Sequence, residues 1–344
     1  MNHFRGDGTN YLSVRGDEYK RLTPVYDWMK IPGATIVQLD KMPGENEIQK
    51  WGLTDYVGAV TDGTYGAVGL DFKSPHTGLA AKKVWFFFDK TYVCLGTDIS
   101  SRMKNQVLTT VNQCLLNGQV TVSDADGIHP QERGSRMKKG VRWVVHDRVG
   151  YYFLNKENVI LSNQRTEGSW KIANRQTTTP TDIIQQDVFT LSVDHGSYPN
   201  NEGYAYMVVP SADPLSIEKQ VEEEGVVVLA NCPDVQAVRH DGLNMAYAVF
   251  YKGGTLRIHD KIVVEMDAPG MLMVKYNDAG EILTLGVSDP TRFMKKLHLS
   301  VNQRIVGTAQ ENIQTEWDGK QALTRITVEL PQNEYAGKSV IYNL

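Results

Sequence analysis

Two histidines lie in surroundings that could support acid–base chemistry. His195 stands between Asp194 and Gly196, and a neighbouring carboxylate can orient an imidazole that exchanges protons. His76 lies in a loop that follows Pro75. A polar hairpin loop explains the first pattern better, and a loop histidine is more often a surface residue than a base. The sequence contains no nucleophile elbow, P-loop or glycine-rich dinucleotide motif that would identify an enzyme by itself.

Oxygen donors gather in a loop that is rich in proline and glycine, at Gln38, Asp40, Glu45 and Glu47. Calcium prefers several carboxylate and carbonyl oxygens, so this loop could hold a structural calcium ion. A solvated acidic loop is the commoner outcome, because EF-hand spacing is absent and the eight histidines lack metal-ligand spacing. We therefore expect no required cofactor.

Two further features could contact a carbohydrate. Trp51 lies in a polar loop where the core pattern does not require it, and an exposed indole can stack on a sugar ring. A tryptophan that packs on the core fits the sequence equally well. A basic run could contact an acidic polymer, although a solvated loop is the commoner outcome. This run consists of Arg133, Arg136, Lys138, Lys139 and Arg142.

Length and composition set the broad class. The chain has 344 residues, of which 41% are hydrophobic, so it can bury a large core in one or two domains. A net charge of −4 lacks the basic excess that nucleic-acid binding needs. The sequence contains neither a membrane-spanning apolar run nor the pattern of a signal peptide. Three cysteines are too few for a disulfide framework, and Cys94 and Cys114, which lie in apolar strand patterns, are expected to be buried, small hydrophobic residues.

The strongest structural signal is the stretch KKVWFFFDKTYVCLG, residues 82–96. Apolar runs at 84–88 and 91–95 flank Asp89-Lys90, which predicts a hairpin. Both faces of these strands are apolar, so we expect them to be covered on both sides. Many further short apolar runs are separated by turn residues, which indicates an all-β chain built of antiparallel sandwiches.

Local patterns also predict particular pairings. Residues 141–146 should pair with 151–154, and residues 188–193 with 204–209. Asn117-Gly118 predicts a hairpin turn, because both residues tolerate positive φ. One short helix is expected over residues 216–224, after Asp213-Pro214. The strands become shorter and more evenly spaced near residue 250, which favours a domain boundary between 245 and 255.

Several segments in combination resemble polysaccharide lyase family 8, the chondroitin AC, hyaluronate and xanthan lyases. The similarity runs in order over about residues 2–330, and Tyr26 and Ala34 replace a tryptophan and a threonine that are commoner in the family. The segments are GDGTNYL (6–12), RGDEYKRLTPVYDWMKIPGAT (15–35), KKVWFFFDKTYVCLG (82–96), SVDHGSYP (192–199) and YAYMVVP (204–210).

The resemblance implies an architecture of an α/α toroid, a large antiparallel supersandwich of the galactose-mutarotase-like type and a smaller β-sandwich. This chain matches the last two parts. We therefore expect the supersandwich over residues 1–250 and the C-terminal β-sandwich over 251–344. The resemblance also implies a secreted or periplasmic protein whose signal peptide would be specified upstream.

The family cleaves acidic polysaccharides by β-elimination next to a uronic acid. Its catalytic Asn, His, Tyr and Arg lie in the toroid, and none of their motifs matches this chain, so we assign no catalytic residue. The implied partners are a hyaluronan- or chondroitin-like polysaccharide and the toroid of the same protein, with neither nucleic acid nor membrane. Candidates for substrate contacts are Asn2, Arg5 and Trp51, and calcium binding in the family's β region lends some support to the acidic loop.

Three functional hypotheses remain open at this point. The first is the β half of a family 8 lyase, catalytically incomplete by itself and forming one wall of the substrate cleft. The second is a stand-alone carbohydrate-binding or accessory module. The third is a lyase whose base lies in the β region, with His76 or His195 in that role.

Overall fold

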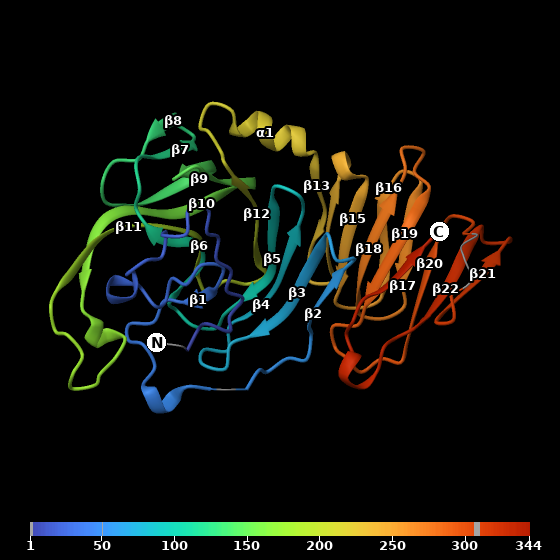
Figure 1. Ribbon diagram of the computed structural model, residues 1–344, viewed down its shortest axis with the longest axis horizontal. Coiled ribbons are helices and arrows are strands. Elements are labelled where there is room, and N and C mark those ends of the chain that lie inside the picture. Colours follow the sequence, from blue (N-terminus) through green and yellow to red (C-terminus); the bar gives the residue numbers. More distant parts are fainter. Residues whose placement is uncertain (1–2, 50, 306–309) are drawn as a thin grey trace. The chain divides into compact units, whose positions relative to one another are not determined.

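The computed structural model describes residues 3–49, 51–305 and 310–344 and consists mainly of antiparallel β-sheet, which confirms the predicted all-β class. The chain folds into two compact units (Figure 1). The first unit contains residues up to 53 together with 72–81 and 98–217, and the second contains 54–71, 82–97 and 218–344. The predicted boundary near residue 250 stays a prediction.

The first unit is built on one antiparallel sheet. Within it the strands follow the order β1-β6-β11-β10-β12, and β9, β7 and β8 continue from β10. Bulky residues such as Trp143, Phe153 and Phe189 are fully buried in its core. The strands are β1 (Thr35–Val37), β6 (Gln106–Leu115), β7 (Val120–Asp124), β8 (Gly127–Pro130), β9 (Ser135–His146), β10 (Val149–Gly168), β11 (Ile184–Ser197) and β12 (Glu202–Pro210).

Strand β10 explains one confirmed pairing and one wrong one. Its first residues pair with β9 across a turn at Asp147-Arg148, where both residues have positive φ, so the predicted hairpin is confirmed. The predicted pairing of 188–193 with 204–209 is wrong. Strand β10 instead pairs with each of them along a different part of its length: its last ten residues pair with β11 and its first five with β12.

The turn at Asn117-Gly118 is a second correction. Gly118 has the expected positive φ of 73°, so the local turn chemistry is right. The strands that this turn joins, β6 and β7, do not pair with each other, because β7 pairs with β8 and β9. The turn therefore connects two strands without forming a hairpin.

The second unit contains a β-sandwich. One of its sheets has the order β13-β14-β15-β18-β19-β23 and the other β16-β17-β20-β22-β21. Phe250, Leu272, Leu297 and Ile326 belong to the buried cluster that these sheets enclose. The strands are β13 (Val226–Asn231), β14 (Val235–His240), β15 (Met245–Phe250), β16 (Gly254–His259), β17 (Ile262–Met266), β18 (Gly270–Tyr276), β19 (Ile282–Ser288), β20 (Lys296–Val301), β21 (Ile313–Asp318), β22 (Leu323–Glu329) and β23 (Val340–Asn343).

The predicted central hairpin and helix are confirmed. Phe88 donates its backbone N–H to Thr91 O at 3.0 Å, which closes the turn at Asp89-Lys90. The flanking strands are β4 (Ala80–Phe87) and β5 (Tyr92–Ser100), and β2 (Val57–Thr61) pairs with β3 (Gly66–Lys73). Helix α1 spans Ile217–Glu224. Single 3₁₀ turns lie at Thr23–Val25 (η1), Glu45–Glu47 (η2), Trp170–Ile172 (η3), Asp241–Leu243 (η4) and Asn333–Tyr335 (η5).

The buried carboxyl of Glu157 should make the stability of the first unit depend on pH. Burial raises the pKa of its carboxyl to about 7. The negative charge of Glu202 adds to this rise, and a hydrogen bond from Ala205 N–H opposes it. Between pH 4.5 and 7 the folded chain therefore keeps a proton that the unfolded chain releases. We expect the free energy of unfolding to fall as the pH rises through this window, because the unfolded state binds fewer protons.

Urea unfolding at pH 5, 6, 7 and 8 measures this effect. Glu157→Gln should flatten the decline by about 1 kcal/mol or more, since one pKa unit corresponds to about 1.4 kcal/mol. Glu167→Gln, a change of the same kind at an exposed site, should leave the decline as it is. If the free energy of unfolding falls equally with pH in Glu157→Gln and in the unmodified chain, the pKa of Glu157 is not raised by folding.

Candidate functional site

A pocket of about 290 Å³ opens in the N-terminal segment of the first unit. Aromatic side chains form most of its wall, and one exposed arginine stands beside them. The lining residues are Arg5, Tyr11, Tyr19, Leu22, Thr23, Tyr26 and Trp28. We call this set the aromatic pocket.

The rings of the aromatic pocket support one another. Tyr11 meets Tyr19 edge to face with ring centroids 5.0 Å apart, and Tyr26 packs against Trp28 at 5.0 Å. The hydroxyls of Tyr11 and Tyr26 lie 3.2 Å apart. The Tyr19 hydroxyl donates to Leu12 O at 3.0 Å. These contacts hold the rings in fixed orientations, so a ligand would meet a preorganised surface.

Arg5 supplies the positive charge of the aromatic pocket. Its guanidinium carbon lies 5.6 Å from the centre of the Trp28 ring, within the range of a cation–π contact. A guanidinium presents several N–H donors in one plane, which matches the two oxygens of a carboxylate. Aromatic faces bind the apolar faces of sugar rings. The arrangement can therefore bind a sugar that carries a carboxylate.

The tyrosines of the aromatic pocket are hydrogen-bond donors rather than bases. Burial raises the pKa of Tyr26, and the hydrogen bond with Tyr11 raises it further. Burial likewise raises the pKa of Tyr19. Both phenols therefore stay protonated at neutral pH. The aromatic pocket is equipped to bind and orient a ligand, and these two groups do not favour proton abstraction.

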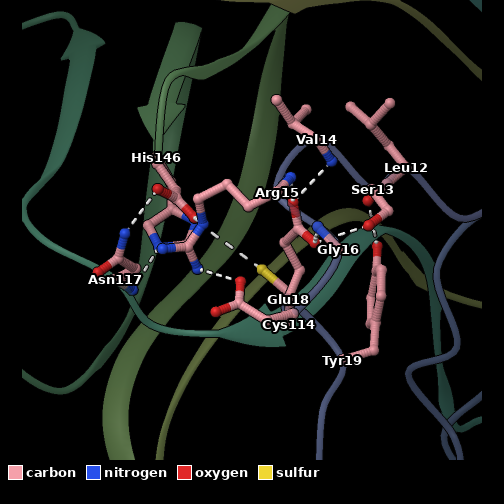
Figure 2. A network of polar contacts seen from close by, with 12 residues as sticks. Leu12, Ser13, Val14, Arg15, Gly16, Glu18, Tyr19, Cys114, Asn117 and His146 are labelled. Carbon is pink, nitrogen blue, oxygen red and sulfur yellow. Dashed lines mark hydrogen bonds and ion pairs between the residues drawn. The ribbon is translucent and has the colours of Figure 1, made fainter.

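The loop that carries Tyr19 is organised by the buried carboxylate of Glu18 (Figure 2). Glu18 accepts the backbone N–H groups of Val14 and Arg15, each at 2.6 Å, and of Gly16 at 2.9 Å. The Ser13 hydroxyl donates to it at 2.7 Å. Burial alone would raise the pKa of this carboxyl, but the hydrogen bonds outweigh burial and lower the pKa to about 2. Arg15-Gly16-Asp17 is thus a tight turn wrapped around Glu18.

Two further connections hold the segment on the sheet. The guanidinium of Arg15 forms an ion pair with Asp147 at 3.0 Å. The side chain of Gln113, which is buried in β6, accepts from Asp27 N–H at 2.9 Å and donates to Lys30 O at 2.6 Å. A residue of the sheet thereby fixes the backbone on both sides of Trp28.

A buried cysteine–histidine contact lies beside this loop (Figure 2). Asn117 N–H donates to Nε2 of His146 at 3.0 Å, so Nδ1 carries the proton and points at Cys114 Sγ, 3.8 Å away. Burial raises the pKa of the Cys114 thiol and lowers that of His146 to about 4. Burial thus favours the neutral form of both groups, and Cys114 is a buried, free cysteine, as the sequence predicts.

The structure places the three predicted substrate residues differently. Arg5 lines the aromatic pocket. Trp51 is 84% exposed, so it does not pack on the core, and it does not line the aromatic pocket. Asn2 lies outside the described residues. A role in substrate binding stays a prediction for all three.

Two side chains of the oxygen-rich loop form hydrogen bonds with nearby backbone groups. Gln38 donates from its side-chain amide to Met29 O at 3.0 Å, and the Glu47 carboxylate accepts Gly44 N–H. Within residues 3–49, 51–305 and 310–344 no group of three or more His, Cys, Asp or Glu side chains could hold a metal ion. Calcium binding near Asp40 and Glu45 stays a prediction.

The two histidines of interest lie in packed surroundings. His195 belongs to β11, is buried, and has its Nε2 2.8 Å from Thr109 Oγ1, so the predicted hairpin loop at this position is wrong. His76 packs its ring 5.4 Å from that of His3 and 5.7 Å from that of Phe4. Burial and the neighbouring His3 lower the pKa of His76. Neither arrangement favours a catalytic base.

Most of the predicted basic run is neutralised by neighbouring acids. Arg133 pairs with Asp187 at 2.8 Å and Lys138 with Asp124 at 2.9 Å. Arg136 pairs with Glu132 at 2.5 Å, and Arg142 lies over the Tyr152 ring at 5.4 Å. The run is therefore a poor candidate for contact with an acidic polymer.

Sequence reasoning missed the aromatic pocket as a site. It identified Arg5 as a candidate for substrate contact, but it assigned no part in a site to Tyr11, Tyr19, Tyr26 or Trp28. The available signal was the recurrence of aromatic residues at 11, 19, 26 and 28 within a polar, turn-rich stretch that follows an arginine.

Comparison with known proteins gives a consistent result. Residues 1–221 match the super-sandwich domain of polysaccharide lyase family 8, and residues 227–298 match its C-terminal β-sandwich domain. Chondroitinase-AC from Pedobacter heparinus is 34% identical over 345 residues, which cover 99% of this chain and 46% of that protein. Hyaluronate lyase from Thermasporomyces composti is 29% identical over 316 residues, 89% of this chain and 39% of that protein.

A solved chondroitinase AC lyase has the same fold. The two structures superpose with a TM-score of 0.84 and share 34% sequence identity. The match covers 97% of this chain and 47% of the chondroitinase chain. The chain thus spans about half the length of these relatives. The described part of the chain contains no helix that is long and apolar enough to cross a membrane.

Proposed function

Because the chain belongs to polysaccharide lyase family 8, we propose that it is the β-sheet portion of a lyase that cleaves hyaluronan or chondroitin by β-elimination. In this proposal it forms one wall of the substrate cleft. The observation that carries the proposal is the similarity to a chondroitinase over nearly the whole chain. The aromatic pocket with Arg5 supports it, because these groups match a sugar that bears a carboxylate.

The division of labour follows from the chemistry of the reaction. β-Elimination removes the proton at C5 of a uronic acid after its carboxylate has been neutralised, and the leaving oxygen at C4 then takes up a proton. In this chain the tyrosines of the aromatic pocket are held protonated, and His195 is buried against Thr109. We therefore assign the base to an N-terminal toroid of the same protein, and binding and orientation to this chain.

A second candidate is a carbohydrate-binding module without catalysis. It is favoured by the aromatic pocket, which has binding groups, while its two buried tyrosines are not poised as bases. The two candidates differ in whether a catalytic partner domain acts on the bound sugar. For the lyase we further propose a secreted or periplasmic location, because its polymeric substrate does not cross membranes.

Arg5 provides a direct test of the aromatic pocket. Arg5→Ala should raise the Kd of this chain for hyaluronan and chondroitin oligosaccharides about tenfold, since a charge-assisted hydrogen bond to a carboxylate is lost. Arg5→Lys should retain part of the affinity, because the charge remains but the planar fork is lost. Isothermal titration calorimetry measures both.

The matched control is Lys20→Ala, which removes one exposed positive charge from the same segment without touching the aromatic pocket. It should change Kd by less than about twofold. If Arg5→Ala and Lys20→Ala bind alike, the assignment of Arg5 to the sugar carboxylate is wrong.

A further inference from the structure

A second and larger depression, of about 890 Å³, lies elsewhere in the first unit. Three loops contribute to it: the one between β3 and β4, the one between β5 and β6, and the one between β11 and β12. It shares no lining residue with the aromatic pocket. Lys73, Arg102, Tyr198 and Asn200 are the side chains that matter here, and we call this depression the basic groove.

The positive charges of the basic groove are uncompensated. Lys73 and Arg102 are both exposed, and within the described part of the chain neither forms an ion pair and no acidic residue lines the groove. Arg133 and Lys138 differ in this respect, because neighbouring carboxylates neutralise them. Two unpaired cations facing one concavity attract an anion and raise its local concentration.

Tyr198 adds an aromatic surface to the basic groove. It is 59% exposed, and its backbone has a φ of 52°, in the left-handed region that residues other than glycine rarely adopt. Such strain persists where the surroundings impose it, and it is often found at binding sites. Exposure of a large ring on a strained turn is not explained by packing of the core.

Neighbouring loops hold this turn in place. Tyr198 N–H donates to Met103 O at 3.3 Å, and Ser101 N–H donates to Pro199 O at 2.9 Å. Asn201 N–H donates to the Ser100 hydroxyl at 3.0 Å. Hydrogen bonds therefore join the loop that carries Arg102 to the loop that carries Tyr198, so the backbone positions of the cation and the ring are held next to each other.

On this geometry we propose that the basic groove is a second carbohydrate-binding site, which takes an acidic sugar unit of the polymer. Lys73 and Arg102 bind its anionic group, a uronate carboxylate or a sulfate ester, and the Tyr198 ring stacks on the sugar face. The identity of the ligand as an acidic polysaccharide rests on the proposed function. A chain with two such sites binds a long polymer more tightly than either site alone, provided that both can be occupied together.

Calorimetric titration of this chain tests the proposal, with hyaluronan oligosaccharides, chondroitin sulfate oligosaccharides and neutral dextran as separate probes. The double variant Lys73→Ala/Arg102→Ala should raise Kd for the acidic probes at least about tenfold and reduce the dependence of Kd on salt. The control Lys90→Ala/Lys156→Ala removes the same charge from exposed lysines outside the groove that form no ion pair with any described residue, and it should change Kd less than about twofold.

Tyr198 is tested by a pair of substitutions. Tyr198→Phe keeps the ring and should bind as the unmodified chain does. Tyr198→Asn removes the ring but tolerates the left-handed backbone, and it should raise Kd about fivefold or more. Circular dichroism checks that each variant has the same fold.

The outcomes separate the possible ligands and the two proposals. A loss for both acidic probes identifies the carboxylate as the bound anion, and a loss for chondroitin sulfate alone identifies the sulfate. Equal affinity of the double variant and its control, absence of any binding by the unmodified chain, or dextran binding as tight as that of the acidic probes would each overturn the inference. The lyase proposal depends on turnover, which is measured separately, so either proposal can fail while the other stands.

Discussion

Glu18→Gln should lower the free energy of unfolding of this chain by about 2–4 kcal/mol at pH 7. The substitution replaces a buried carboxylate that accepts three backbone N–H groups and one hydroxyl with an amide that brings two donors into the same place. At least one donor then faces another donor. Because Tyr19 follows directly in the chain, the aromatic pocket should loosen with the loop, and affinity for acidic oligosaccharides should fall as well.

Glu18 should also make the free energy of unfolding depend on pH. The folded chain holds the pKa of Glu18 at about 2, against 4.5 as the ordinary value. The stability that Glu18 contributes is therefore present above pH 4.5 and is lost as the pH falls from 4.5 toward 2. Urea unfolding at pH 7, 4.5 and 3 should show a larger loss of stability in the unmodified chain than in Glu18→Gln, because Asp62, Asp124 and Asp187, whose pKa values are also lowered, contribute equally to both.

Asp17→Asn is the matched control for Glu18→Gln. Asp17 is an exposed neighbour in the same turn and pairs with Arg15 at 2.8 Å on the surface. Its substitution should cost less than about 1 kcal/mol. If the two variants lose equal stability, the Glu18 carboxylate does not organise this loop.

Gly33→Ala should destabilise the chain by more than about 3 kcal/mol. Gly33 has a φ of 83°, and a Cβ atom there would lie 2.5 Å from the backbone nitrogen of Asn10 and 2.7 Å from Gly8 O. Backbone atoms cannot turn aside as the end of a flexible side chain can. The segment before β1 would have to move, and the aromatic pocket with it.

Gly118→Ala is the control that measures the cost of placing alanine at a positive φ without a steric clash. Gly118 also has positive φ, 73°, but nothing lies within 4 Å of the position of its Cβ. Its substitution should cost about 1–2 kcal/mol, the ordinary penalty of a left-handed residue. Thermal unfolding of both variants gives the comparison. Similar losses would mean that the close approach to Asn10 is tolerated.

The predicted hairpin at 84–95 and the helix at 217–224 were readable from the sequence because their signals are local. Alternating apolar residues around Asp89-Lys90 specify the hairpin, and residues 216–224 follow a turn at Asp213-Pro214. The pairing of β11 with β12 was wrong because β10, 20 residues long, pairs with β12 at its start and with β11 at its end, although it precedes both in sequence. Turn chemistry and strand patterns carry no information on which distant strand will be the neighbour.

The candidate site was predictable only in part for a similar reason. Arg5 was identified because its positive charge suits an acidic polymer. The contacts that turn Tyr11, Tyr19, Tyr26 and Trp28 into one pocket depend on how Glu18 and Gln113 fold the segment. Those contacts link residues that are up to 86 positions apart. Likewise, His195 was expected in a loop, because its bond to Thr109 on a different strand is invisible in the local sequence.

The most direct test of the central claim is ultraviolet absorbance of this chain mixed with hyaluronan and, separately, with chondroitin sulfate. β-Elimination creates a C4=C5 double bond conjugated to the carboxylate, and that bond absorbs. We predict a flat trace from this chain alone, in samples where calorimetry shows that the polysaccharide is bound, and a rise when chondroitinase-AC from Pedobacter heparinus is added to the same cuvette. A rise in proportion to the concentration of this chain would contradict the account, because the catalytic groups would then lie within these 344 residues.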